Sequence, residues 1–262
     1  MLFFCAGLSA SPGAEGKGRE SSVRLNVQVH HYLYREYDDS GDKLNQEKGN
    51  LPGLDLVYRS GNADWKWRLG WQIMSKDIDY QGKTNLGNRF TTLTDERIDS
   101  FYAEAEWTLL PSLSAIAALK RVEWDRQIRA RGAILGLNEV YNWHQVELGV
   151  EYQVFSRGAW QWLIEGRVIR IVRPTVKIDL TRSRLGSPRL IMQDKNGYSA
   201  GLAMRYQASP TVHLTSRLNC RYWSFGASDL TEVGDRIIPV RIQEPKSRSA
   251  LTSSSVGIDY LF

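Results

Sequence analysis

The sequence predicts an all-β fold: a closed antiparallel transmembrane β-barrel of about ten strands, connected as an up-and-down meander. Apolar and polar residues alternate with period two in about ten segments, which is the pattern of strands with two different faces. Short and long connections follow each other in turn between these segments. The chain also closes on an alternating segment that ends with Phe262.

The composition favours strands rather than helices as the elements that cross the membrane. The 262 residues have a mean hydropathy of −0.39, and no run of apolar residues reaches the length of about 18 that indicates a transmembrane helix. A barrel escapes this test because only alternate residues face lipid. Nine Trp and twelve Tyr fit a membrane protein, because both side chains favour the interface between bilayer and water.

Most alternating segments are long enough for a tilted strand, which needs about nine to eleven residues to cross a bilayer. In the segment 145–155, for example, Val146, Leu148 and Val150 alternate with Glu147 and Gly149. The apolar positions are expected to face lipid and the polar positions the lumen. The segments lie at 23–33, 54–58, 65–73, 101–107, 113–119, 145–155, 159–170, 197–207, 211–224 and 256–262.

The connections predict the orientation of the barrel. Four are tight turns, around residues 61–63, 110–112, 156–158 and 209–210. Five are long and polar, at 37–50, 78–96, 125–143, 173–196 and 225–248. Outer-membrane barrels have short periplasmic turns and long extracellular loops, so both ends of the barrel domain are expected on the periplasmic side.

The chain is expected to form one barrel domain over residues 21–262, preceded by a leader. Residues 1–20 begin with a short apolar run, Leu2 to Leu8, followed by small residues up to Ala14, which indicates a signal peptide. The two cysteines, Cys5 and Cys220, do not form a disulfide framework.

The last segment resembles the C-terminal signature of Gram-negative outer-membrane proteins. Its sequence alternates apolar residues up to a terminal aromatic, and the residues that carry the resemblance are Val256, Gly257, Ile258, Tyr260 and Phe262. The resemblance implies location in the cell outer membrane and recognition by the barrel assembly machinery.

The length, strand count and loop rhythm also resemble the ten-stranded omptin proteases. That resemblance implies two Asp at the outer rim facing an Asp–His pair. Asp77 and Asp79 match the first pair in type and place, but the sequence contains no Asp-x-His for the second. His144 lies near the outer rim without an adjacent Asp. An omptin-like surface protease is therefore kept only as an alternative, and the expectation is a protein that is not an enzyme.

The polar positions of the segments predict a lumen rich in both signs of charge. Charges removed from bulk water need partners, so a side-chain network that fills the lumen is the favoured interpretation. A narrow, substrate-specific channel is the alternative. The predicted network consists of Arg24, Arg59, Lys66, Arg68, Glu104, Glu106, Lys120, Glu147, Glu151, Glu165, Arg167, Arg205, Arg217, Arg221 and Asp259.

These observations predict a non-catalytic outer-membrane barrel with a structural or surface-interaction role, or one that passes small solutes. The net charge of +5 comes without a nucleic-acid-binding module, so no nucleic-acid partner is expected. The expected partners are outer-membrane lipid and lipopolysaccharide, whose phosphates suit basic loop residues. The four His are dispersed, no metal site or cofactor is predicted, and we expect a monomer. The basic residues of the fourth loop are Arg173, Lys177, Arg182, Arg184 and Arg189.

Overall fold

The computed structural model describes residues 20–83, 87–132, 134–183, 185–234 and 240–262. The predicted leader therefore lies outside the described residues, apart from the first residue of β1. Among the described residues, no helix is long and apolar enough to span a bilayer.

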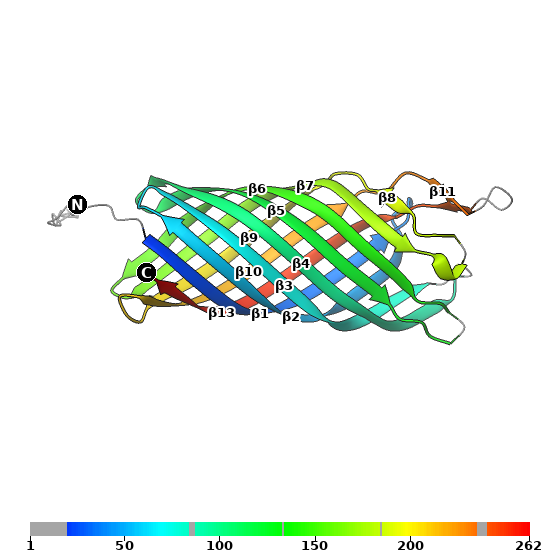
Figure 1. Cartoon of the computed structure of the whole chain (residues 1–262), viewed down its shortest axis with the longest axis horizontal. Helices are drawn as coiled ribbons and strands as arrows, with labels where there is room; N and C mark the ends of the chain where they lie inside the picture. The colour runs from blue at the N-terminus through cyan, green and yellow to red at the C-terminus, as the bar shows by residue number, and fades with distance from the viewer. Residues whose placement is uncertain (1–19, 84–86, 133, 184, 235–239) are drawn as a thin grey trace, which may run out of the picture.

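Ten long strands form a closed antiparallel barrel, as the alternation predicts (Figure 1). Each strand pairs with its neighbours in the chain, and the last strand pairs with the first to close the cylinder. The strands are β1 (Glu20–Tyr37), β2 (Lys43–Gly61), β3 (Trp65–Lys83), β4 (Arg89–Leu110), β5 (Leu113–Ile128), β6 (Leu137–Arg157), β7 (Trp160–Asp179), β9 (Asn196–Gln207), β10 (Val212–Phe225) and β13 (Lys246–Leu261).

Four smaller elements lie in the last two outer connections. β8 (Arg189–Ile191) pairs with the end of β7, and β11 (Thr231–Val233) pairs with β12 (Val240–Ile242). A short 3-10 helix, η1, spans Thr181–Ser183. Figure 1 places β8 and β11 at the end of the barrel opposite the two termini.

The predicted turns are confirmed, whereas three of the predicted long loops are largely strand. The chain turns between strands at 62–64, 111–112, 158–159 and 208–211, at the end of the barrel that holds the termini. The outer connections after β1, β3 and β5 span only 38–42, 84–88 and 129–136. The strands thus continue well beyond the predicted segments, and the predicted loops at 37–50, 78–96 and 125–143 are wrong over most of their length.

The extra strand length was hidden because the hydrophobic alternation reverses partway along several strands. On β5, Leu119 points outward and is 64% exposed, whereas Val122 and Trp124 point inward and are buried. On β1, Val29 faces outward and Tyr32 inward in the same way. A strand in lipid needs apolar residues outside, and a strand in water needs them inside. The reversal therefore marks the outer edge of the membrane on these strands.

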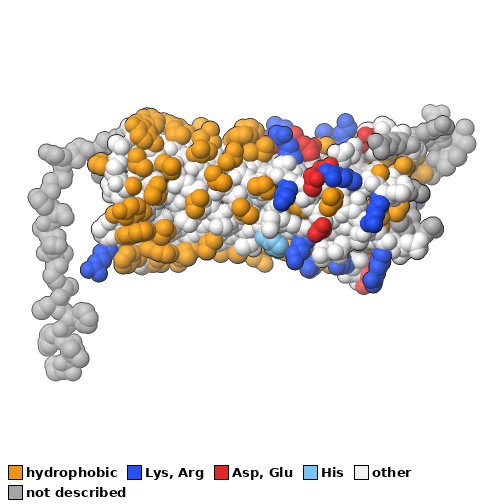
Figure 2. Space-filling model, turned by 90° about the horizontal axis from the view of Figure 1, so that it is seen from below, with side chains coloured by type: hydrophobic (Ala, Val, Ile, Leu, Met, Phe, Trp, Pro, Cys, Tyr) orange, Lys and Arg blue, Asp and Glu red, His pale blue; other side chains and the backbone are white. Residues whose placement is uncertain are grey.

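We call the half of the barrel that holds the termini the lower barrel and the other half the upper barrel. In Figure 2, apolar side chains form a belt on the outer surface of the lower barrel, at the left, and charged side chains lie mainly on the upper barrel, at the right. Exposed, outward-facing side chains such as Leu25, Phe101 and Leu148 form the belt. Near the periplasmic turns its edge is aromatic: the rings of Trp65 and Trp107 lie 4.4 Å apart. This is the girdle that membrane barrels carry at the interface. The belt fixes the lower part of the lumen at the level of the bilayer.

Candidate functional site

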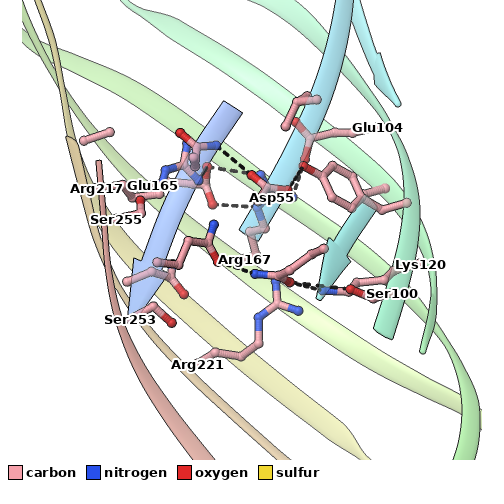
Figure 3. A pocket seen from close by; sticks show the side chains of 18 of the residues that line it. Asp55, Ser100, Glu104, Lys120, Glu165, Arg167, Arg217, Arg221, Ser253 and Ser255 are labelled. Atoms are coloured by element: carbon pink, nitrogen blue, oxygen red, sulfur yellow. Dashed lines mark hydrogen bonds and ion pairs between the residues drawn. The ribbon is translucent and has the colours of Figure 1, made fainter. Parts of the chain in front are cut away.

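The lumen contains two layers of different chemistry. The layer inside the apolar belt is polar and contains a cavity of about 200 Å³. Side chains from all ten barrel strands line this cavity, and every strand except β13 contributes a charged one. Figure 3 shows Arg167, Arg221, Lys120 and Glu165 facing this space. The layer above it, towards the outer connections, is a core of buried apolar residues.

Glu106 on β4 is the centre of an ion-pair cluster in the polar layer. Its Oε2 lies 2.5 Å from Nη2 of Arg68 and 3.7 Å from Nη2 of Arg59. Its Oε1 accepts a 3.0 Å hydrogen bond from Nζ of Lys66. Arg68 also reaches Glu104, the next inward-facing residue of β4, at 3.0 Å. One carboxylate thus serves three cations.

Arg167 on β7 is the centre of a second cluster. Its Nη1 lies 2.6 Å from Glu104 and 3.3 Å from Glu147, and its Nε donates to Glu165 at 2.6 Å. Arg221 on β10 reaches Glu147 at 2.8 Å. Glu104 belongs to both clusters, so a continuous network across the lumen connects β3 and β4 with β7 and β10.

Two further ion pairs and several neutral hydrogen bonds extend this network. Arg217 lies 3.4 Å from Glu165, and Arg24 lies 2.8 Å from Asp259. Asp55 accepts hydrogen bonds from Asn26 Nδ2 and Tyr102 Oη. Gly257 of the C-terminal segment faces the lumen, where a Cβ would overlap the amide of Asn26.

Three members of the predicted network make no salt bridge within the described part of the chain. Lys120 Nζ donates instead to Gln72 Oε1 at 3.2 Å. Arg205 Nη1 donates to Gln161 Oε1 at 3.4 Å. Glu151 lines the cavity beside them. The remaining predicted members are brought together as described, and Asp55 joins them.

The upper layer closes the lumen with aromatic and aliphatic side chains. Trp124 stacks on Tyr141 with ring centroids 4.5 Å apart, and Tyr141 faces Phe225 at 6.3 Å. Tyr32 and Trp223 continue the layer at 6.3 Å. The full set is Tyr32, Tyr34, Leu51, Met74, Ile78, Ile98, Val122, Trp124, Tyr141, Trp143, Ile169, Ile171, Val176, Ile178, Leu190, Met192, Trp223, Phe225 and Leu251.

At the outer edge of the upper layer, a buried arginine forms ion pairs with residues of several strands. Arg126 on β5 donates to Glu47 at 2.8 Å, to Glu36 at 2.9 Å and to Glu139 at 2.6 Å. Its guanidinium also lies over the ring of Tyr34, 4.8 Å from the centroid. These pairs connect β1, β2, β5 and β6 above the membrane, where the sequence predicted loops.

The last outer connection docks on this arginine cluster. Tyr141 Oη donates a 2.6 Å hydrogen bond to Glu244, which lies between β12 and β13 and is buried. Burial, and then repulsion by Glu139 and Glu36, raises the pKa of Glu244 well above its ordinary value. The outer connections therefore pack down as part of the core.

The sequence interpretation missed the upper layer completely. Some of its members, such as Ile78, Tyr141 and Val176, stood in segments that were assigned to polar loops, and others, such as Val122 and Trp124, lay between a predicted strand segment and the next predicted loop. The signal that identifies them is the spacing of Val122, Trp124, Arg126 and Ile128, which has period two but the opposite phase to Leu119. The basic residues Arg173 and Lys177 of the predicted fourth loop lie on β7, and Arg189 lies on β8. Arg184 and the side chain of Arg182 lie outside the described residues.

The two rim aspartates of the omptin comparison point away from the lumen. Asp77 lies on the outer surface, 2.5 Å from Nη2 of Arg129. Asp79 is exposed on the same face of β3, and His144 is exposed on β6. In the described part of the chain, Asp77 and Asp79 have no histidine partner.

The closed barrel and its apolar belt define the class of protein. Apolar residues in contact with water around a whole cylinder would be unfavourable, and a closed barrel is the β-structure that satisfies its backbone hydrogen bonds inside a bilayer. The protein is an integral β-barrel of the bacterial outer membrane.

Comparisons with solved structures agree with this fold. The outer membrane protease OmpT from Escherichia coli matches with a TM-score of 0.63 and 12% identity, over 93% of this chain and 96% of that chain. The outer membrane protein OprG from Pseudomonas aeruginosa matches with a TM-score of 0.41 and 11% identity, over 94% and 97% of the two chains. No protein-family model and no curated protein sequence matches the chain.

Proposed function

We propose that the protein is a non-conducting, non-catalytic outer-membrane barrel with a structural or surface-interaction role. The observation that carries this proposal is the apolar upper layer, in which Tyr32, Trp124 and Ile171 are fully buried. A path for ions needs water or polar groups along its whole length, because an unpaired charge in an apolar environment costs several kcal/mol or more. The polar cavity alone does not supply such a path.

Planar-bilayer recording of the purified, folded chain tests this proposal. We expect no unitary conductance steps from the wild-type protein. Replacing Trp124 and Tyr141 together with Ala removes two stacked rings of the upper layer and should produce steps. The matched control replaces two lipid-facing aromatics, Trp162 and Tyr198, with Ala and should stay silent. Regular steps from the wild-type protein would support the narrow, substrate-specific channel instead.

The proposal of a non-catalytic barrel has separate support. Asp77 pairs with Arg129 on the outer surface, so its carboxylate does not face a groove over the lumen. Cleavage of unstructured peptides by the purified chain, lost on replacing Asp77 and Asp79 with Ala, would favour the omptin-like alternative.

The surface that meets the membrane suggests lipid phosphates as one partner. Arg121 and His144 face outward opposite each other on β5 and β6, above the lipid-facing Leu119 and Val146. Arg170 on β7 lies opposite Val146 and extends this basic edge to a third strand. Lipopolysaccharide phosphates at this height fit the arrangement. Equal lipopolysaccharide retention by wild type and by R121Q with R170Q would argue against it.

A further inference from the structure

Arg205 on β9 occupies an unusual position in the lumen. Its side chain lines both the central cavity and a second cavity, of about 150 Å³, at the periplasmic end of the barrel. Its Nε is buried and has no hydrogen-bond partner. Within the described part of the chain, its one hydrogen bond, from Nη1 to Oε1 of the neutral Gln161, is long at 3.4 Å. Most of the hydrogen-bond donors of this guanidinium are therefore free to bind a ligand that lies between the two cavities.

The nearest charges to Arg205 include two more arginines. Arg24 on β1 and Arg59 on β2 lie close enough to repel it. Arg24 lies 2.8 Å from Asp259. Arg59 has only a 3.7 Å contact with Glu106, whose carboxylate also pairs with Lys66 and Arg68. Three guanidinium groups from three strands thus surround one region of the lumen.

Asp259 and Glu151 face the same region, and the exposed Glu20 lines the periplasmic cavity, but none of these three carboxylates pairs with Arg205 within the described residues. Asp259 is held by Arg24, and Glu151 makes no salt bridge within the described residues. An arginine that is shielded from bulk water needs a partner, because the cost of an uncompensated charge rises as the surroundings become less polar. A mobile anion would provide the missing charge.

We propose that Arg205, together with Arg24 and Arg59, binds a small inorganic oxyanion of the phosphate or sulfate class. The forked donors of a guanidinium match the oxygen atoms of such an ion, and charge-assisted hydrogen bonds are the strongest available here. The ion enters from the periplasm, since the periplasmic cavity opens beside Arg205 and the apolar layer closes the other end of the lumen. This site is independent of whether the barrel conducts.

Calorimetric titration of the folded full chain in detergent, with inorganic phosphate and with sulfate as separate probes, tests the proposal. We expect saturable binding of one ion per chain. R205Q should weaken that binding about tenfold or more, the effect of losing hydrogen bonds to a charged group. The control is R97Q, which removes one positive charge from the outer surface, where Arg97 pairs with Asp99, and should leave the affinity unchanged. Chloride should compete poorly, because it offers no forked oxygen pair.

A second variant separates the ion site from an internal ion pair. E151Q removes a carboxylate that lines the central cavity with Arg205 and makes no salt bridge within the described residues, so it should raise the affinity several-fold if the site binds anions in the wild type. Absence of saturable binding in the wild type, or equal losses in R205Q and R97Q, would overturn the proposal. If R205Q lacks the heat-modifiable gel migration of a folded barrel, R205K replaces it and should also bind more weakly, because Lys keeps the charge but loses the fork.

Discussion

Among single residues, Glu106 is one of the two centres of the ion-pair network in the polar layer. Its carboxylate meets three cations, and its side chain is only 3% exposed. Removing one partner of a buried ion pair is costly because the other charges stay buried without compensation. The stability of the lower barrel should therefore depend on this residue far more than on any surface pair.

The change Glu106→Gln should lower the free energy of unfolding by about 3–5 kcal/mol, the range for breaking a buried ion pair. Urea unfolding of the barrel in detergent measures this difference. The matched control is Asp99→Asn, which breaks the 2.7 Å pair with the half-exposed Arg97 on the outer surface. An exposed pair contributes about 1 kcal/mol or less. Equal effects of the two substitutions would show that the lumen is hydrated well enough to screen its charges.

Among the elements, the connection between β10 and β13 docks on the barrel in a way that depends on the protonation of one carboxyl group. Glu244 is buried against Tyr141, with Glu139, Glu36 and Arg126 as its charged neighbours. Its pKa is raised in the docked state, so docking binds a proton that the free carboxyl releases near its ordinary pKa of 4.5. The contribution to stability is full below that pH and is lost as the pH rises through the raised pKa.

A spin label at Leu230→Cys, in a Cys220→Ser background, should report this docking. We expect the label to be immobile in acid and to become more mobile as the pH rises. Glu244→Gln keeps a neutral acceptor for Tyr141, so this variant should remove the pH dependence. Glu232→Gln, an exposed residue of β11 paired with Arg241, is the control and should keep it. A pH-dependent transition that survives in Glu244→Gln would contradict the assignment.

The strands also show which part of the fold was readable from the sequence. Within the belt, alternation gave the strand order, the facing of Leu148 and Glu147 and the position of the turns, because lipid outside and polar groups inside impose one strict pattern. Above the belt, Trp124 and Arg126 both face inward, and charged residues such as Glu123 and Asp125 face outward. A period-two pattern whose phase reverses partway along resembles a polar loop when it is read only for lipid-facing residues.

The candidate site was predictable in its membership but not in its pairing. Any inward-facing charge of a strand could be placed in the lumen from its position alone. Which charges meet depends on the stagger between strands: Glu104 meets Arg167 from β7, although the two residues are far apart in the chain. For the same reason, the isolated position of Arg205 could not be seen in the sequence.

For the whole molecule, the central feature is the division of the lumen into a polar layer in the membrane and a dry layer outside it. The lower layer is typical of a membrane barrel, and the upper layer is packed like the interior of a water-soluble β-protein. The outer connections contribute Leu190 and Met192 to this upper layer. We therefore expect water and solutes to enter the lumen from the periplasmic end and to stop at the aromatic residues.

Thiol labelling tests this division most directly. In a background where Cys5 and Cys220 are Ser, Val176→Cys places a thiol in the upper layer, where Val176 is fully buried, and Ser255→Cys places one on the polar cavity. In the folded barrel, a small water-soluble thiol reagent should modify position 255 and should leave position 176 unmodified until the protein is unfolded. Rapid modification of position 176 in the folded protein would contradict a dry, closed upper layer.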